Sequence, residues 1–178
     1  MFKLIEKYAI NEPKNLLCSF IYILGMFLGL VYLGPMSVKQ GLAVGLPKYI
    51  LIQLSGILVT VLFWHMMVRI ARGTKGIGET YRITALVSIL NVGFMLLVIS
   101  LAYIFYGSAF FSCEVFPETF FRVVNVMNFI VSGLSVVILV RAFYLFKKIK
   151  IARFFTFLVI FLVVIGVGFL VFTKMMYS

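Results

Sequence analysis

The most constraining feature of the sequence is a set of long apolar runs without charged side chains. The longest covers residues 83–113, and a membrane-spanning helix needs about 20 apolar residues to cross a hydrocarbon core of about 30 Å. Hydrophobic residues make up 64% of the chain and charged residues only 12%, whereas about a quarter of a soluble domain is charged. A chain of 178 residues cannot bury so much apolar surface in its own core. We therefore expect lipid to surround most of the chain.

The apolar runs predict an all-α fold, a polytopic bundle of five transmembrane helices. Unpaired backbone groups in lipid cost several kcal/mol each, so a spanning segment pairs them within a helix or a closed barrel. The runs are too long and continuous for barrel strands, which have about 10 residues and alternate in polarity. We expect an N-terminal segment at 1–15 and one transmembrane domain at 16–178. Its spans are predicted at about 16–34, 49–68, 83–106, 123–140 and 154–173.

The N-terminal segment has the pattern of a short amphipathic helix. Phe2, Ile5 and Ala9 share one helical face, and the lysines of this segment lie elsewhere. Pro13 should end the helix by about Glu12, because a residue before proline disfavours helical backbone angles. The pattern predicts an interfacial helix on the inner leaflet, and a frayed terminus fits it equally well.

Basic residues are distributed unequally between the two sides of the predicted bundle. Lys and Arg collect on the cytoplasmic side of membrane proteins, so we expect the N-terminus in the cytoplasm and the C-terminus outside. The net charge of +11 reflects mostly this bias, and we expect no nucleic-acid partner. The expected inner side holds Lys3, Lys7, Lys14, Arg69, Arg72, Lys75, Arg82, Arg141, Lys147, Lys148, Lys150 and Arg153, and the outer side holds Lys39, Lys48, Arg122 and Lys174.

The chain lacks the residue combinations that catalysis or metal binding usually needs. It has one His, two Cys and no Asp, so a Ser-His-Asp arrangement has no aspartate to orient its histidine. A zinc site needs three or four Cys, His or carboxylate ligands, and the predicted topology separates Cys18 from Cys113 by the membrane. We therefore expect no enzyme activity, no catalytic residue, no cofactor and no metal.

Two basic inner connections are the candidate binding surface. Retention of these connections in the cytoplasm is one explanation for their charge. The other is binding of anionic lipid or of a membrane or cytoplasmic protein, to which each basic residue near an anionic leaflet contributes about 1 kcal/mol. The candidate binding residues are Arg69, Arg72, Lys75, Arg82, Lys147, Lys148 and Lys150.

Small and polar residues inside the predicted spans have two interpretations. As packing residues, Gly25 and Gly29 form a G-x-x-x-G face that suits contact within the chain or with a second copy, and Asn91 and Ser135 lie at matching depths for a hydrogen bond. As a polar path, the residues would serve a channel, a lipid-moving protein or a permease subunit. A shared cavity would favour the path, and closed helix contacts would favour packing. The path residues are Gln53, Ser88, Asn91, Asn125, Asn128, Ser132 and Ser135.

The run from His65 to Thr84 resembles the signature of the Yip (Ypt-interacting protein) membrane family. The chain lacks the proline that this family often has early in its third helix and the tryptophan it often has in its fourth span. The resemblance implies five spans with the N-terminus inside. Eukaryotic members act in early secretory traffic and contact small GTPases, and the short N-terminal region is more similar to prokaryotic members. The matching residues are His65, Gly73, Lys75, Gly76, Glu79, Thr80 and Arg82.

Together these features predict a non-catalytic integral membrane protein. We expect a Yip-like scaffold or accessory subunit, multi-pass in a prokaryotic cytoplasmic membrane. Its expected partners are the bilayer with its anionic lipids and another membrane or cytoplasmic protein bound by the basic inner connections.

Overall fold

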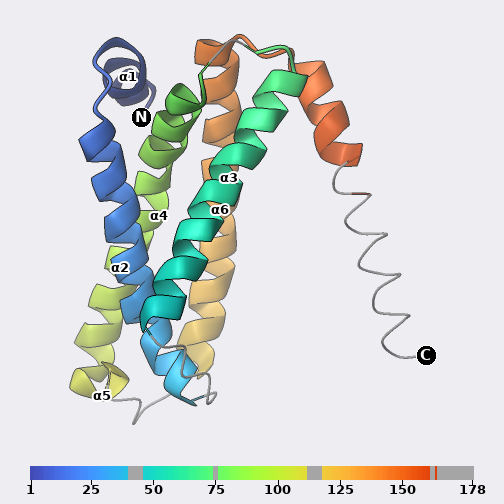
Figure 1. The fold of residues 1–178 in the computed structure, drawn as a ribbon. Coiled ribbons are helices and arrows are strands. Elements are labelled where there is room, and N and C mark those ends of the chain that lie inside the picture. Colours follow the sequence, from blue (N-terminus) through green and yellow to red (C-terminus); the bar gives the residue numbers. More distant parts are fainter. Residues whose placement is uncertain (40–45, 74–75, 112–117, 161–162, 164–178) are drawn as a thin grey trace.

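The computed structural model describes residues 1–39, 46–73, 76–111, 118–160 and 163, and these residues are helical apart from short turns (Figure 1). No strand occurs among them, so the all-α prediction is confirmed. A further helix begins at Ile151 and is followed to Ile160. The labelled elements are α1 (Phe2–Ile5), the π-helix η1 (Glu6–Asn11), α2 (Asn15–Lys39), α3 (Leu46–Ile70), α4 (Ile77–Tyr106), α5 (Ser108–Phe111) and α6 (Glu118–Lys147).

Three helices are long and apolar enough to cross a membrane: α3 over Ile50–Ile70, α4 and α6. Two shorter apolar helical segments are also described: Asn15–Gly29, which is the first part of α2, and Ile151–Ile160. The predicted spans 16–34, 49–68, 83–106 and 123–140 fall inside α2, α3, α4 and α6. Most of the predicted span 154–173 lies outside the described residues.

Helix α4 extends beyond its predicted apolar span at one end only. It begins at Ile77 and ends at Tyr106, followed by Gly107 with a positive φ of 57°. The apolar run marks only the part suited to hydrocarbon, and the helix continues through a polar first turn that contains Glu79. A carboxylate in the first turn interacts favourably with the positive end of the helix dipole.

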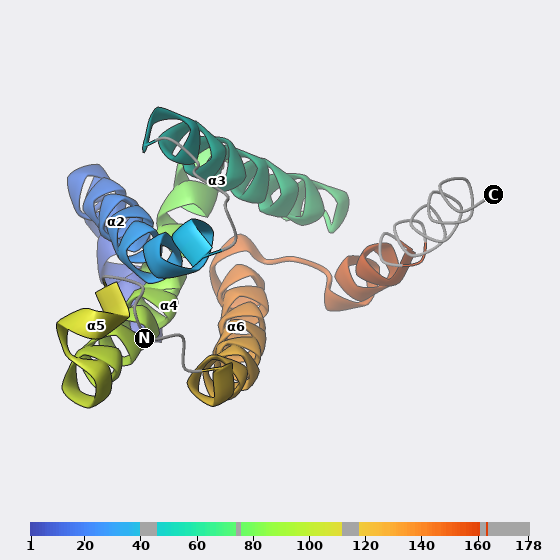
Figure 2. The ribbon, with the colours of Figure 1, turned by 90° about the horizontal axis from the view of Figure 1, so that it is seen from below.

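The bundle is built around α4, which contacts α2, α3 and α6 (Figure 2). Ile83, Ala85 and Leu86 of α4 are fully buried in the core cluster. Large apolar side chains cover the outside, such as Phe129 at 81% exposure and Ile104 at 72%. Such a surface would aggregate in water and suits a lipid environment. We call the end that carries α1, the start of α4 and the end of α6 the inner end.

The N-terminal segment packs on the inner end of α4. Ile5 and Ala9 are buried, and both α1 and η1 contact α4. The helical stretch ends at Asn11, and Glu12 has φ −124° and ψ 78° before Pro13. The expected helix therefore exists, and its apolar face covers protein. Its contact with the inner leaflet stays a prediction.

The expected packing residues lie where α4 meets its neighbours. Ser135 Oγ of α6 lies 3.4 Å from Asn91 Oδ1 of α4 and 2.9 Å from the carbonyl oxygen of Val131. A Cβ on Gly25 would lie 3.4 Å from Val92 Cγ2, an ordinary van der Waals approach between α2 and α4. The packing role of Gly29, one turn further along α2, stays a prediction.

Candidate functional site

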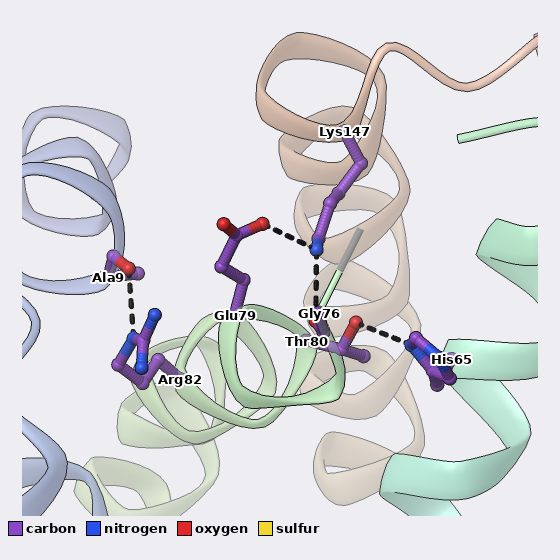
Figure 3. Close-up of polar contacts among 7 residues, drawn as sticks. All are labelled: Ala9, His65, Gly76, Glu79, Thr80, Arg82 and Lys147. Atoms are coloured by element: carbon purple, nitrogen blue, oxygen red, sulfur yellow. Dashed lines mark hydrogen bonds and ion pairs between the residues drawn. The ribbon is translucent and has the colours of Figure 1, made fainter. Parts of the chain in front are cut away.

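An ion pair joins α4 to α6 at the inner end. Lys147 Nζ lies 2.6 Å from Glu79 Oε2 and 3.2 Å from the carbonyl oxygen of Gly76 (Figure 3). The Lys147 side chain is completely buried, and that of Glu79 is 34% exposed. Burial and pairing hold this ammonium inside the protein, and binding of a partner or anionic lipid by Lys147 stays a prediction.

The chain's single histidine links α3 to α4. His65 Nδ1 lies 3.3 Å from Thr80 Oγ1, and Thr80 is fully buried. The neighbouring Trp64 stacks on Phe154 of the helix that begins at Ile151, with ring centroids 6.0 Å apart and planes 4° apart. Among the described residues, no group of three or more His, Cys, Asp or Glu side chains is placed to hold a metal ion. His65 therefore acts here as an interhelical contact.

Gly73 occupies a turn with no space for a side chain. A Cβ there would lie 2.7 Å from Val68 Cγ1 and 2.8 Å from Ile149 Cγ2, closer than real contacts allow. The backbone N–H of Lys150 donates to the carbonyl oxygen of Ala71 at 2.9 Å, so the two inner connections touch through backbone as well. The close approach explains why glycine is needed at this position.

Arg82 holds the N-terminal segment against α4. Its Nε donates to the carbonyl oxygen of Ala9 at 2.9 Å, and its Nη1 donates to Asn15 Oδ1 at 3.1 Å. The side chain is half-buried. Arg82 thus makes internal contacts, and its binding of a partner or anionic lipid stays a prediction.

These contacts form one structural unit, which we call the inner clasp: Glu79 with Lys147, His65 with Thr80, and Arg82 with Ala9. The sequence resemblance marked residues of the clasp without assigning them contacts, and it omitted Lys147. Lys75, another residue of that signature, lies outside the described residues. The clasp connects the N-terminal segment, α3 and α6 to the start of α4.

Four of the predicted binding residues remain on the surface of the inner end. We call Arg69, Arg72, Lys148 and Lys150 the inner basic surface. All four are exposed, and their side chains make no hydrogen bond or ion pair within the described part of the chain. Arg72 and Lys148 have positive φ angles of 57° and 50°, where the chain turns after α3 and α6.

Two cavities lie along α4, farther from the inner end than the clasp. The first, of about 170 Å³, lies between α2, α3 and α4, and the second, of about 220 Å³, lies between α3, α4 and α6. Both are lined by Tyr22, Ser88 and Asn91, so they adjoin. The first also has Gln53 in its wall, and the second has Thr60, Thr84, Ser132 and Ser135.

The cavities collect most of the polar residues predicted to line a path. Asn125 and Asn128 are absent from the two linings, and Asn125 is exposed on α6. Pairing also occurs, since Asn91 and Ser135 contact one another at the cavity wall. The residues that do line the cavities are Gln53, Ser88, Asn91, Ser132 and Ser135.

Comparison of the chain with protein-family models, with curated proteins and with solved structures finds no match. The similarity to the Yip family thus depends on the quoted residues, and membership stays a prediction.

Proposed function

We propose that the chain is a five-span integral membrane protein with its N-terminus in the cytoplasm and its C-terminus outside. The three long apolar helices support this proposal, together with two shorter ones whose apolar sequence continues to residues 34 and 173. The excess of Lys and Arg in the inner connections supports the orientation. By its resemblance to prokaryotic Yip proteins, we place it in a prokaryotic cytoplasmic membrane.

Within that membrane we propose a non-catalytic, Yip-like scaffold or accessory subunit that binds anionic lipid or an acidic protein through the inner basic surface. The observation that carries the proposal is that basic side chains at one end of the bundle fall into two groups, one bonded within the protein and one exposed. Lys147 and Arg82 make internal contacts in the inner clasp, whereas the four residues of the inner basic surface remain exposed. A clasp that connects the helix ends would hold such a surface in place for a partner.

A triple variant, Arg69→Gln with Arg72→Gln and Lys150→Gln, tests this function. At about 1 kcal/mol per basic residue, we expect affinity for phosphatidylglycerol to fall about a hundredfold. Titration of the purified protein with this lipid, followed by native mass spectrometry, measures the loss. Arg122→Gln is the matched control, because Arg122 is exposed at the other end of α6. Wild-type affinity in the triple variant would show that the basic surface only sets topology.

Thiol labelling tests the orientation independently. Cys113 lies outside the described residues in the connection expected on the outer side, and Cys18 is buried in α2. An impermeant reagent should label Cys113 in intact cells. In a Cys113→Ser background, Lys148→Cys should react only after the cells are permeabilised. The opposite pattern would reverse the proposed orientation.

The two adjoining cavities favour a second candidate: a channel, a lipid-moving protein or a permease subunit. Polar side chains from α3, α4 and α6 that share a cavity are what a polar path requires. In vesicles with a fluorescent phospholipid, dithionite bleaches only the outer leaflet unless the protein moves lipid between leaflets. Bleaching of both leaflets by wild type, and of one by Asn91→Leu, would support lipid movement. Outer-leaflet bleaching by wild type would exclude it.

A further inference from the structure

One face of α3 borders both cavities. Gln53 and Ile57 line the first cavity, and Thr60 and Trp64 line the second. Their spacing of four, three and four residues places them on one side of a helix. The two cavities thus form one crevice beside α4. One stretch of α3 borders the first cavity, and the following stretch borders the second.

The crevice lies near the middle of the helices that would cross the membrane. Asn91 is about 21 Å along α4 from Ile77 at 1.5 Å per residue, and the 30-residue helix is about 45 Å long. In the proposed bilayer this depth belongs to the hydrocarbon core, where unmatched polar groups are costly.

Several side chains in the crevice have hydrogen-bonding capacity that the protein does not use. Ser88 Oγ donates to the carbonyl oxygen of Ala85 at 2.7 Å, so the hydroxyl proton of Ser88 is already bonded within α4. In the described part of the chain, the side chains of Gln53, Thr60 and Ser132 make no hydrogen bond. The Asn91 carboxamide contacts only Ser135 Oγ, at 3.4 Å. A carboxamide has two N–H donors and an oxygen that accepts twice.

The crevice opens between α3 and α6. Thr60 and Ser132 both line the second cavity and are both exposed, so the mouth lies between the two helices that carry them. Among the described residues, no charged side chain lines either cavity, so an ion would find no opposite charge from them there. The chemistry of the lining therefore suits a small, neutral group that both donates and accepts hydrogen bonds.

We infer that this crevice is a hydrated binding site in the middle of the membrane for a neutral, hydroxyl-bearing group. Water satisfies the unused donors and acceptors when the site has no other occupant. The occupying hydroxyl group belongs either to a small solute from the aqueous phase or to the uncharged headgroup of a lipid that enters between α3 and α6. The inference rests on the proposed membrane placement, and on neither of the two proposed activities.

Cysteine reactivity in reconstituted vesicles tests the inference. In a Cys18→Ala, Cys113→Ala background, Thr60→Cys and Ser132→Cys line the crevice. Val59→Cys and Leu134→Cys are their matched controls, since the native side chains are 64% and 52% exposed on the outer surface of the same helices. Thiols react as thiolates, which form where water is present, so a water-soluble methanethiosulfonate should label the crevice positions about tenfold faster.

If the crevice cysteines and their control cysteines are labelled equally slowly, the crevice is dry and the inference is overturned. If both sets of cysteines are labelled equally fast, the outer surfaces of α3 and α6 face water, which would overturn the membrane placement instead. Asn91→Leu should slow labelling of Ser132→Cys several-fold, because it removes a polar group at the centre of the crevice. Asn125→Leu, which changes an exposed residue of α6, should leave the rate unchanged.

Two additions distinguish the sources of the hydroxyl group. Protection of Ser132→Cys by glycerol in the buffer would assign the site to an aqueous solute. Protection by diacylglycerol in the vesicles would assign it to a lipid. Fast labelling without protection by either compound would overturn the inference that the crevice binds a hydroxyl-bearing ligand, and would leave water as its occupant.

Discussion

Lys147 at the end of α6 lies 2.6 Å from Glu79 at the start of α4, although the two residues are 68 positions apart in sequence. The pair exists only because these two helices pack side by side. The lysine is completely buried, and the Glu79 carboxylate lies directly beside its ammonium group. Removal of one member of a buried pair costs about 3–5 kcal/mol, because the other charge is left without compensation.

Glu79→Gln should therefore lower the free energy of unfolding by about 3 kcal/mol, at the low end of that range because Glu79 is 34% exposed. A urea titration of the purified protein in detergent measures the change. Adding Lys147→Met should recover much of the loss, because it removes a buried charge that no longer lies beside a carboxylate. Glu118→Gln is the control, because its pair with Arg122 has side chains 72% and 78% exposed and should contribute at most about 0.5 kcal/mol. Equal effects of the two glutamate substitutions would show that the buried pair contributes little.

Gly73→Ala should destabilise the inner end by about 1–3 kcal/mol, as overpacking does elsewhere. The added methyl group would meet Val68 and Ile149 at 2.7 and 2.8 Å. Gly133→Ala is the matched control, because no atom lies within 4 Å of its added Cβ. That substitution should be neutral or stabilise by about 0.5–1 kcal/mol, since alanine suits a helix interior better. Thermal unfolding should show a lower midpoint for Gly73→Ala and an unchanged or higher midpoint for Gly133→Ala. Equally lowered midpoints in both variants would contradict the clash.

Arg82→Gln should release the N-terminal segment from α4. Hydrogen bonds from charged donors contribute about 1.5–3 kcal/mol each, and Arg82 donates to Ala9 and Asn15. Trypsin should then cut after Lys7 and Lys14 at least tenfold faster, because local opening governs access. Intact-mass spectrometry over a digestion time course measures this rate. Arg69→Gln, which changes an exposed arginine of the same end, should leave it unchanged.

Trp64 is the single tryptophan of the chain, so its fluorescence reports on the helix that begins at Ile151. Phe154 is fully buried and stacks on Trp64, whereas Phe155 is 48% exposed. Phe154→Ala should move the emission maximum to longer wavelength and destabilise the fold by about 3 kcal/mol, because a buried aromatic ring is lost. Phe155→Ala should change neither quantity. Identical spectra for the two variants would argue against this stacking.

Much of the helical framework was predictable from the sequence. The predicted third span ends at Tyr106, and so does α4. The contact between Asn91 and Ser135 followed from their depths along two neighbouring runs, because a helix advances by a constant 1.5 Å per residue. Apolar runs locate such helices well because each residue's preference for lipid is a local property.

The roles of the basic residues could not be predicted in the same way. Lys147 and Lys148 are adjacent in sequence, yet the first is buried and the second exposed. Lys147 follows the buried Phe143 by one helical turn on the face that α6 turns toward α4. The sequence places both lysines in the same inner connection, and only the packing of α6 against α4 decides which of them is buried.

The amino-acid sequence alone determined that the chain is helical and where its apolar helices run, because transfer of each side chain from water to lipid depends little on its neighbours. Tertiary structure decided which cations form the inner clasp, which remain on the inner basic surface, and which polar groups line a common crevice. Those outcomes depend on distances between atoms far apart in sequence, and only the packing of α3, α4 and α6 sets such distances.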